Sequence, residues 1–145
     1  MRILRGLALI TFGLAALQVS PAAAQQCVPG ATRTPDQIAR RQDGVRAART
    51  INNLEANQPG SASKKYLSQG ELASSPFATT QTGAAGEFFK KLNFTPGEEL
   101  MPGWELTLDV TGSGYWFAIK DKTDPCGLTF ISNQKGLIWE AQPLQ

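Results

Sequence analysis

The first regular pattern of apolar residues lies between about Pro35 and Asn57. Its apolar positions recur every three or four residues, which places them along one side of an α-helix. They are Ile38, Val45, Ala48, Ile51 and Leu54. Thr34 and Gln37 have the spacing of a capping box at the start of this run, and Pro35 suits the first helical position. The sequence therefore predicts a long amphipathic helix over about residues 35–57.

From Gly97 onward the apolar positions repeat every second residue. Trp104, Leu106, Leu108 and Val110 alternate with polar residues, which is typical of a half-buried strand. Three further short strands are expected over residues 115–120, 127–132 and 137–141, with turns between them. Short helices are expected over residues 63–73 and 84–92. Helices followed by hairpin-linked strands favour an α+β fold, with the long N-terminal amphipathic helix packed on a C-terminal four-stranded antiparallel sheet.

The N-terminal residues 1–24 have the pattern of a secretory signal peptide. Arg2 and Arg5 precede an apolar stretch that ends in the small residues Ala22, Ala23 and Ala24. An uncleaved membrane helix and a lipoprotein are the alternatives, but the apolar run is short and Gln25-Gln26 does not suit a lipobox. We expect cleavage after Ala24, a single domain over residues 25–145, no membrane span after processing, and a location in a periplasm or outside the cell.

Processing also changes the charge. Two of the 14 basic residues belong to residues 1–24, so 12 remain against 12 acidic residues. This balance gives no argument for a nucleic-acid partner. Residues 33–65 are nevertheless basic and residues 66–145 acidic. The two segments could pair within the fold, or arginines such as Arg40, Arg46 and Arg49 could form a basic patch for a partner.

The chain contains two cysteines, Cys27 and Cys126. An even pair in an exported protein is expected to form a disulfide, which would tie the start of the mature chain to its C-terminal half. A redox or metal-binding pair is the alternative. The sequence has no C-x-x-C spacing and no histidine, which argues against it.

The sequence predicts no catalytic residue, no cofactor and no metal site. The lack of histidine removes Ser-His-Asp triads, Cys-His pairs and imidazole ligands. Residues 61–64, Ser-Ala-Ser-Lys, match S-x-x-K without its companion motifs. Asp121 and Asp124, with Asp109, could offer oxygens to calcium, but so few carboxylates do not define a site and suit a turn better.

Aromatic side chains remain as candidates for binding. Tyr115, Trp116 and Phe117 are consecutive in a predicted strand, so Trp116 lies on the opposite face if its two neighbours are in the core. Trp139 is open to the same two interpretations. An exposed aromatic residue on a sheet indicates a binding surface, whereas a covering helix or loop would make it structural.

Two stretches resemble type IV pilins and pseudopilins. Residues 39–55, ARRQDGVRAARTINNLE, are similar to the C-terminal half of the long pilin helix. The segments 114–117 (GYWF), 126–132 (CGLTFIS) and 135–141 (KGLIWEA) are similar to the closing strands of pilin-like domains. The resemblance implies a pilin-like globular domain with a role in an envelope assembly such as type II secretion.

The N-terminal segment departs from the pilin pattern. It ends in an ordinary Ala-rich cleavage site and has no acidic residue, whereas a pilin keeps an apolar helix half with a Glu at its fifth position. The resemblance therefore implies a domain without the membrane and assembly helix. We expect a non-enzymatic protein that binds another envelope or secreted protein; a small periplasmic enzyme or inhibitor is the alternative.

Overall fold

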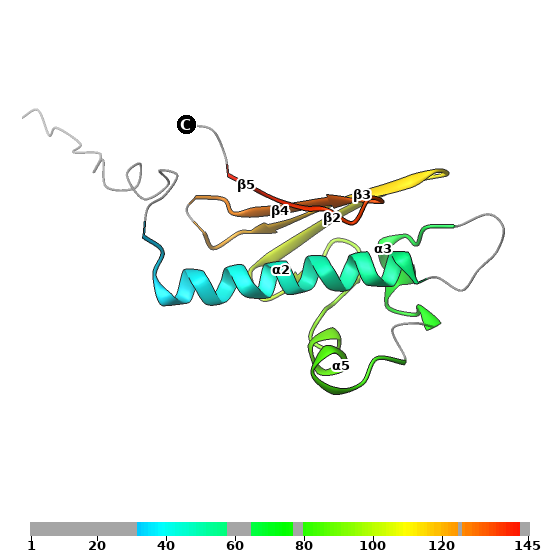
Figure 1. The fold of residues 1–145 in the computed structure, drawn as a ribbon, viewed down its shortest axis with the longest axis horizontal. Helices are drawn as coiled ribbons and strands as arrows, with labels where there is room; N and C mark the ends of the chain where they lie inside the picture. Colours follow the sequence, from blue (N-terminus) through cyan, green and yellow to red (C-terminus); the bar gives the residue numbers. More distant parts are fainter. Residues whose placement is uncertain (1–31, 58–64, 77–79, 125, 143–145) are drawn as a thin grey trace, which may run out of the picture.

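The computed structural model describes residues 32–57, 65–76, 80–124 and 126–142. The predicted signal peptide, Cys27 and the S-x-x-K match at residues 61–64 lie outside these ranges. The described chain forms a long helix, two short helices and an antiparallel sheet (Figure 1). The helices are α2 (Pro35–Ala56), α3 (Gln69–Leu72) and α5 (Gly83–Phe89). The strands are β1 (Glu99–Met101), β2 (Trp104–Thr111), β3 (Gly114–Asp121), β4 (Thr129–Asn133) and β5 (Ile138–Ala141).

The predicted α+β class and the long helix are confirmed. Helix α2 begins with the expected capping box: the Gln37 backbone N–H donates to Thr34 Oγ1, and the Thr34 N–H donates to the Gln37 side chain. These bonds satisfy backbone donors that the first helical turn leaves without a partner. Of the described helices, none has the length and apolar content needed to cross a bilayer.

The sheet has five strands, not the predicted four. Its spatial order is β1-β2-β3-β4-β5, so each strand pairs with its neighbour in sequence. The additional strand, β1, has three residues and joins β2 through a tight turn in which Gly103 has a φ of 78°. Three residues are too few to show an alternating pattern, which explains why the sequence did not reveal β1.

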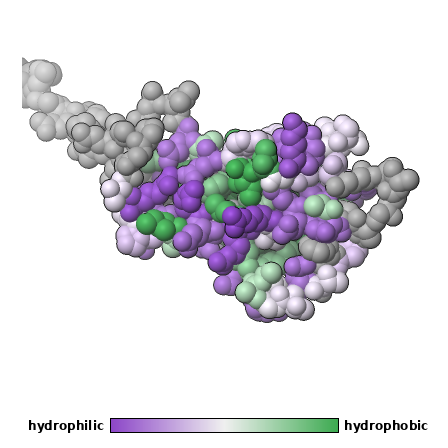
Figure 2. Space-filling view, viewed as in Figure 1, coloured by the Kyte–Doolittle hydropathy of each residue, from purple (hydrophilic) through white to green (hydrophobic). Residues whose placement is uncertain are grey.

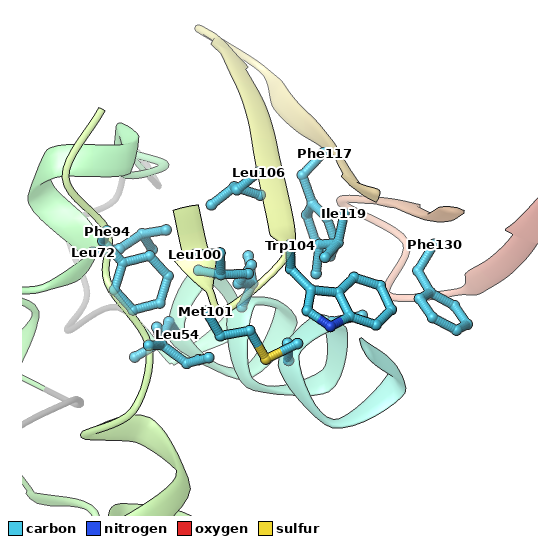
Figure 3. Close-up of a cluster of buried hydrophobic side chains, with 14 of the residues drawn as sticks. Leu54, Leu72, Phe94, Leu100, Met101, Trp104, Leu106, Phe117, Ile119 and Phe130 are labelled. Atoms are coloured by element: carbon cyan, nitrogen blue, oxygen red, sulfur yellow. The ribbon is translucent and has the colours of Figure 1, made fainter. Parts of the chain in front are cut away.

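Helix α2 lies along one face of the sheet (Figure 1). Buried apolar residues of the helix and the sheet form one core cluster. Trp104, Phe117 and Phe130 project from three neighbouring strands into this layer (Figure 3). Leu54 of α2 and Leu72 of α3 lie in the same cluster. The layer is therefore held mainly by aromatic side chains of the sheet packed against one stripe of the helix.

The buried stripe of α2 differs from the predicted one at its start. Ile38 is 46% exposed, because it lies off the stripe that faces the sheet, whereas Arg40 in the same turn contacts Asp121 and Trp104. Gly44 and Ala47 are buried instead. An added Cβ at Gly44 would lie 2.4 Å from a ring carbon of Phe130 and 2.5 Å from one of Trp104. A glycine is thus required where helix and sheet come closest.

Strand β2 follows the predicted alternation, but burial fades along it. Trp104 and Leu106 are buried, whereas Leu108 and Val110 are only half-buried.

The two short helices are shorter than predicted in the described residues: α3 covers four residues of the range 63–73, and α5 ends at Phe89. Phe88 still reaches the core, with the Arg46 guanidinium 5.0 Å from its ring centre.

Candidate functional site

The face of the sheet that points away from α2 carries two large exposed aromatic residues. Trp116 is 44% exposed and Trp139 is 45% exposed, whereas Tyr115 and Phe117 are buried in the core. The predicted division of the three consecutive aromatic residues is therefore confirmed. Within the described residues, no helix or strand covers this face (Figure 1). We call Trp116, Ile131 and Trp139 together the tryptophan face.

The sheet register brings the members of the tryptophan face together. Ile131 on β4 is directly opposite Trp139 on β5 and Ala118 on β3. Trp116 lies two residues from Ala118 on the same strand, so its side chain is on the same face. Three neighbouring strands about 4.8 Å apart thus present an uncharged surface about 10 Å across. It is large enough for one apolar segment of a partner to rest on.

Trp116 is held in place by its neighbour on β2. Its indole Nε1 donates a hydrogen bond of 3.1 Å to Asp109 Oδ2, and the two residues are directly opposite in the register. Asp109, the third carboxylate considered for calcium, is therefore occupied in orienting an exposed ring. On the side of β2 the tryptophan face is bordered by Asp109 and Glu105, and Glu105 is directly opposite Lys120 of β3, which is exposed on the same face.

The three candidate arginines lie on α2, which packs on the other face of the sheet. Arg40 binds Asp121 through two hydrogen bonds of 2.7 Å each, and its guanidinium lies 5.3 Å from the centre of the Trp104 ring. Arg46 lies over Phe88. Arg49 is exposed beside the β4–β5 turn. The structure therefore separates these arginines from the two tryptophans, and the five candidates do not form a single surface.

The basic helix is matched in part by acidic residues of the sheet. Arg33 and Arg41 both pair with Glu140 of β5, the second at 2.7 Å. Together with the Arg40–Asp121 pair, these contacts support the view that the basic segment pairs within the fold. Hydrophilic residues cover most of the side that displays α2, and its hydrophobic residues lie in small separate areas (Figure 2).

Asp121 and Asp124 act as turn residues. Asp121 Oδ1 accepts hydrogen bonds from the backbone N–H groups of Thr123 and Asp124, and Asp124 Oδ1 accepts one from Cys126 N–H. The turn interpretation is confirmed. In the described part of the chain, no group of three or more Asp, Glu, Cys or His residues is placed to hold a metal ion.

Cys126 is buried at the end of this turn. Cys27, its predicted partner, is outside the described residues, and the disulfide therefore stays a prediction.

A buried polar network, which the sequence analysis missed, joins α2 to the β4–β5 turn. Tyr115 Oη donates to Asn52 Oδ1 at 2.9 Å, and Asn52 Nδ2 donates to Ser132 Oγ and to the Gly136 carbonyl. Ser132 Oγ in turn donates to the Leu137 carbonyl at 2.7 Å. The signal for this network was an asparagine on the apolar side of the helix, next to Ile51. Such a residue is tolerated when its amide is fully hydrogen-bonded.

Burial raises the pKa of Tyr115 to about 12, and the nearby Glu55 and Tyr66 add to the shift. The Tyr115→Phe variant removes one hydrogen bond to Asn52, so we expect a loss of about 1 kcal/mol in the free energy of unfolding. The chain has two tyrosines. An alkaline absorbance titration should therefore show a component near pH 12 that is lost in Tyr115→Phe. A variant spectrum that keeps this component would contradict the assignment.

A groove with both polar and apolar lining residues lies between the C-terminal half of α2 and the β4–β5 turn. It consists of two hollows of about 260 and about 400 Å³. Both hollows are lined by Asn52, Asn53 and Gly136, so they are continuous. The buried network forms the floor of this groove, because Asn52 and Gly136 belong to both. The hydrogen bonds of the network therefore hold Asn52 and Gly136 in place within the protein alone.

Comparisons with protein-family models, curated proteins and solved structures found no match to this chain.

Proposed function

We propose that this protein is an exported, non-enzymatic binding protein with a pilin-like domain, and that its tryptophan face contacts another envelope or secreted protein. The single observation that carries the proposal is the pair of half-exposed tryptophans on one uncharged area of sheet. Burying such rings against a partner removes a large apolar area from water, and tryptophan is enriched among residues that dominate binding energy.

The surroundings of the tryptophan face support a protein partner. Its centre is apolar, and its edge on β2 carries the carboxylates of Glu105 and Asp109. An apolar centre with a polar rim is the usual arrangement of a protein interface. With Lys120 opposite Glu105, this rim carries both signs of charge and suits a partner with a polar rim around an apolar segment. The resemblance of residues 39–55 and 114–141 to pilin-like domains motivates the envelope-assembly role.

The contact can be tested with a photo-crosslinking amino acid placed in the full-length protein in cells that make it. At position 131, in the centre of the tryptophan face, we expect an adduct with a distinct envelope or secreted protein. At position 46, on the exposed side of α2, we expect none. The adduct from position 131 should be lost when Trp116 and Trp139 are both replaced by alanine.

Export and processing are tested separately. N-terminal sequencing of the native protein should give Gln25 as the first residue.

Four results would contradict the proposal. Equal adducts from positions 131 and 46 would mean that the tryptophan face is not a specific surface. An adduct that persists in the double tryptophan variant would show that the rings do not carry binding. A partner that belongs to the cytoplasm would contradict the proposal that the protein is exported. An N-terminus that begins after Gly6 or Gly13 would contradict cleavage after Ala24.

A further inference from the structure

We propose that the groove between α2 and the β4–β5 turn binds a linear ligand with an anionic group near each end. The groove is distinct from the tryptophan face, because it lies on the side of the sheet that packs against α2. It therefore goes beyond the proposed function and does not depend on it. The ligand class follows from the charges and donors of the groove.

The charged residues that line the groove are all basic. Arg49 lines one hollow and Lys135 the other, and no Asp or Glu lines either of them. Arg33, Arg40 and Arg41, by contrast, are paired with carboxylates. Arg49 and Lys135 have no acidic partner within ion-pair distance in the parts of the chain that the structure describes. Arg46, Lys91 and Lys120 also lack an ion pair among the described residues, but only Arg49 and Lys135 line a hollow, where two cations favour an anionic ligand.

The remaining polar groups of the groove include two side-chain amides whose N–H donors have free capacity. Among the described contacts, the side-chain amides of Asn53 and Gln134 make no hydrogen bond within the protein, and both line the groove. Asn52 and Tyr115 are already engaged in the buried network. Amide, ammonium and guanidinium groups together suit a ligand that is rich in oxygen acceptors.

The positions of the two cations indicate a ligand that is extended. The groove follows α2 from Arg49 to Ala56, and seven residues of helix correspond to about 10 Å. Arg49 lies in the hollow next to Ile138, whereas Lys135 lies in the one next to Ala56. A molecule with one anionic group could engage one cation only. A linear dianion could engage both and place its uncharged middle over the amides.

Titrations of the isotope-labelled protein with linear dicarboxylates of five to ten carbons test this proposal by NMR. The half-methyl ester of each compound is the matched monoanion. We expect the backbone amides of Asn53, Gly136 and Leu137 to shift, and the best dianion to bind about five-fold more tightly than its half ester. Added salt should weaken the binding. Bisphosphates of the same lengths then show whether carboxylate or phosphate is preferred.

Charge-removing variants complete the test. Arg49→Gln and Lys135→Gln should each weaken binding of the dianion about five-fold, and each should remove the preference over the half ester. Arg46→Gln is the matched control, because it removes an arginine of the same helix that does not line the groove. Equal affinity for dianion and half ester would overturn the proposal. The same holds for shifts outside the groove or for unchanged binding by Arg49→Gln.

Discussion

The Asp121→Ala variant is expected to lower the free energy of unfolding by about 2–4 kcal/mol, less than the loss of a fully buried ion pair, because the Arg40 side chain is one-third exposed. The Asp121 side chain is 1% exposed, and both of its oxygens accept hydrogen bonds from Arg40. The same carboxylate holds the backbone of Thr123 and Asp124. Its loss therefore affects both the attachment of α2 and the turn after β3.

Urea unfolding followed by circular dichroism measures this change. Asp109→Ala is the matched control, because that carboxylate is exposed and bonds only to the Trp116 indole among its described contacts. We expect the control to change stability by less than about 0.5 kcal/mol. Similar small effects for both variants would mean that the Arg40–Asp121 pair does not hold the helix to the sheet.

The same carboxylate makes stability depend on pH. Burial opposes its ionisation, but the hydrogen bonds from Arg40 and Thr123 outweigh this, so the pKa of Asp121 lies below its usual value. An aspartate in the unfolded chain titrates near about pH 3.9. The stabilisation is therefore complete above that pH and is lost as the pH falls through the lower pKa of the folded state. Asp121→Asn should flatten this part of the curve of stability against pH.

The Gly44→Ala variant is expected to destabilise the protein by about 1–3 kcal/mol, although alanine is the better helix former by about 1 kcal/mol. The new methyl group would lie 2.4–2.5 Å from ring carbons of Phe130 and Trp104. Both rings are almost completely buried, and displacing them would disturb a closely packed core. The helix and the sheet must therefore separate slightly, which loosens the core along their contact.

Gly70→Ala is the matched control for this prediction. Gly70 lies in α3, and its nearest neighbour to an added Cβ is 3.9 Å away, which is ordinary contact. We expect its thermal midpoint to stay the same or to rise slightly, as the substitution reduces the freedom of the unfolded chain. A midpoint for Gly44→Ala at or above that of the wild type would show that the close approach is not sterically limiting.

Local signals predicted the elements of this fold well. The Thr34–Gln37 capping box marked the start of α2 correctly because both of its hydrogen bonds join residues three positions apart. The alternation from Trp104 to Val110 predicted strand β2 correctly because this pattern, too, involves only residues close together in the sequence. The sequence did not predict which stripe of the helix faces the sheet. That orientation leaves Ile38 exposed and buries Gly44, and it depends on tertiary packing.

The candidate site was predicted in part. The split between Trp116 and its two neighbours follows from strand geometry alone. The grouping of Trp116 with Ile131 and Trp139 depends on the register of three strands, which the alternation does not specify. The groove was not predicted, because it is formed by an asparagine pair on α2 and a turn about 80 residues later. No local pattern connects those two segments.

The contacts of α2 with the sheet also determine the order in which the chain can fold. Asn52 and Ser132 are 80 residues apart, and Arg40 and Asp121 are 81 apart. Every strand, by contrast, pairs with the next one along the chain, so the hairpins can form from local contacts. Docking of the helix must close a much longer loop, and the entropy of that closure slows it. We therefore expect helix α2 to pack onto the sheet as the last step of folding, although it is synthesised first. This packing must wait until the final strand has been made.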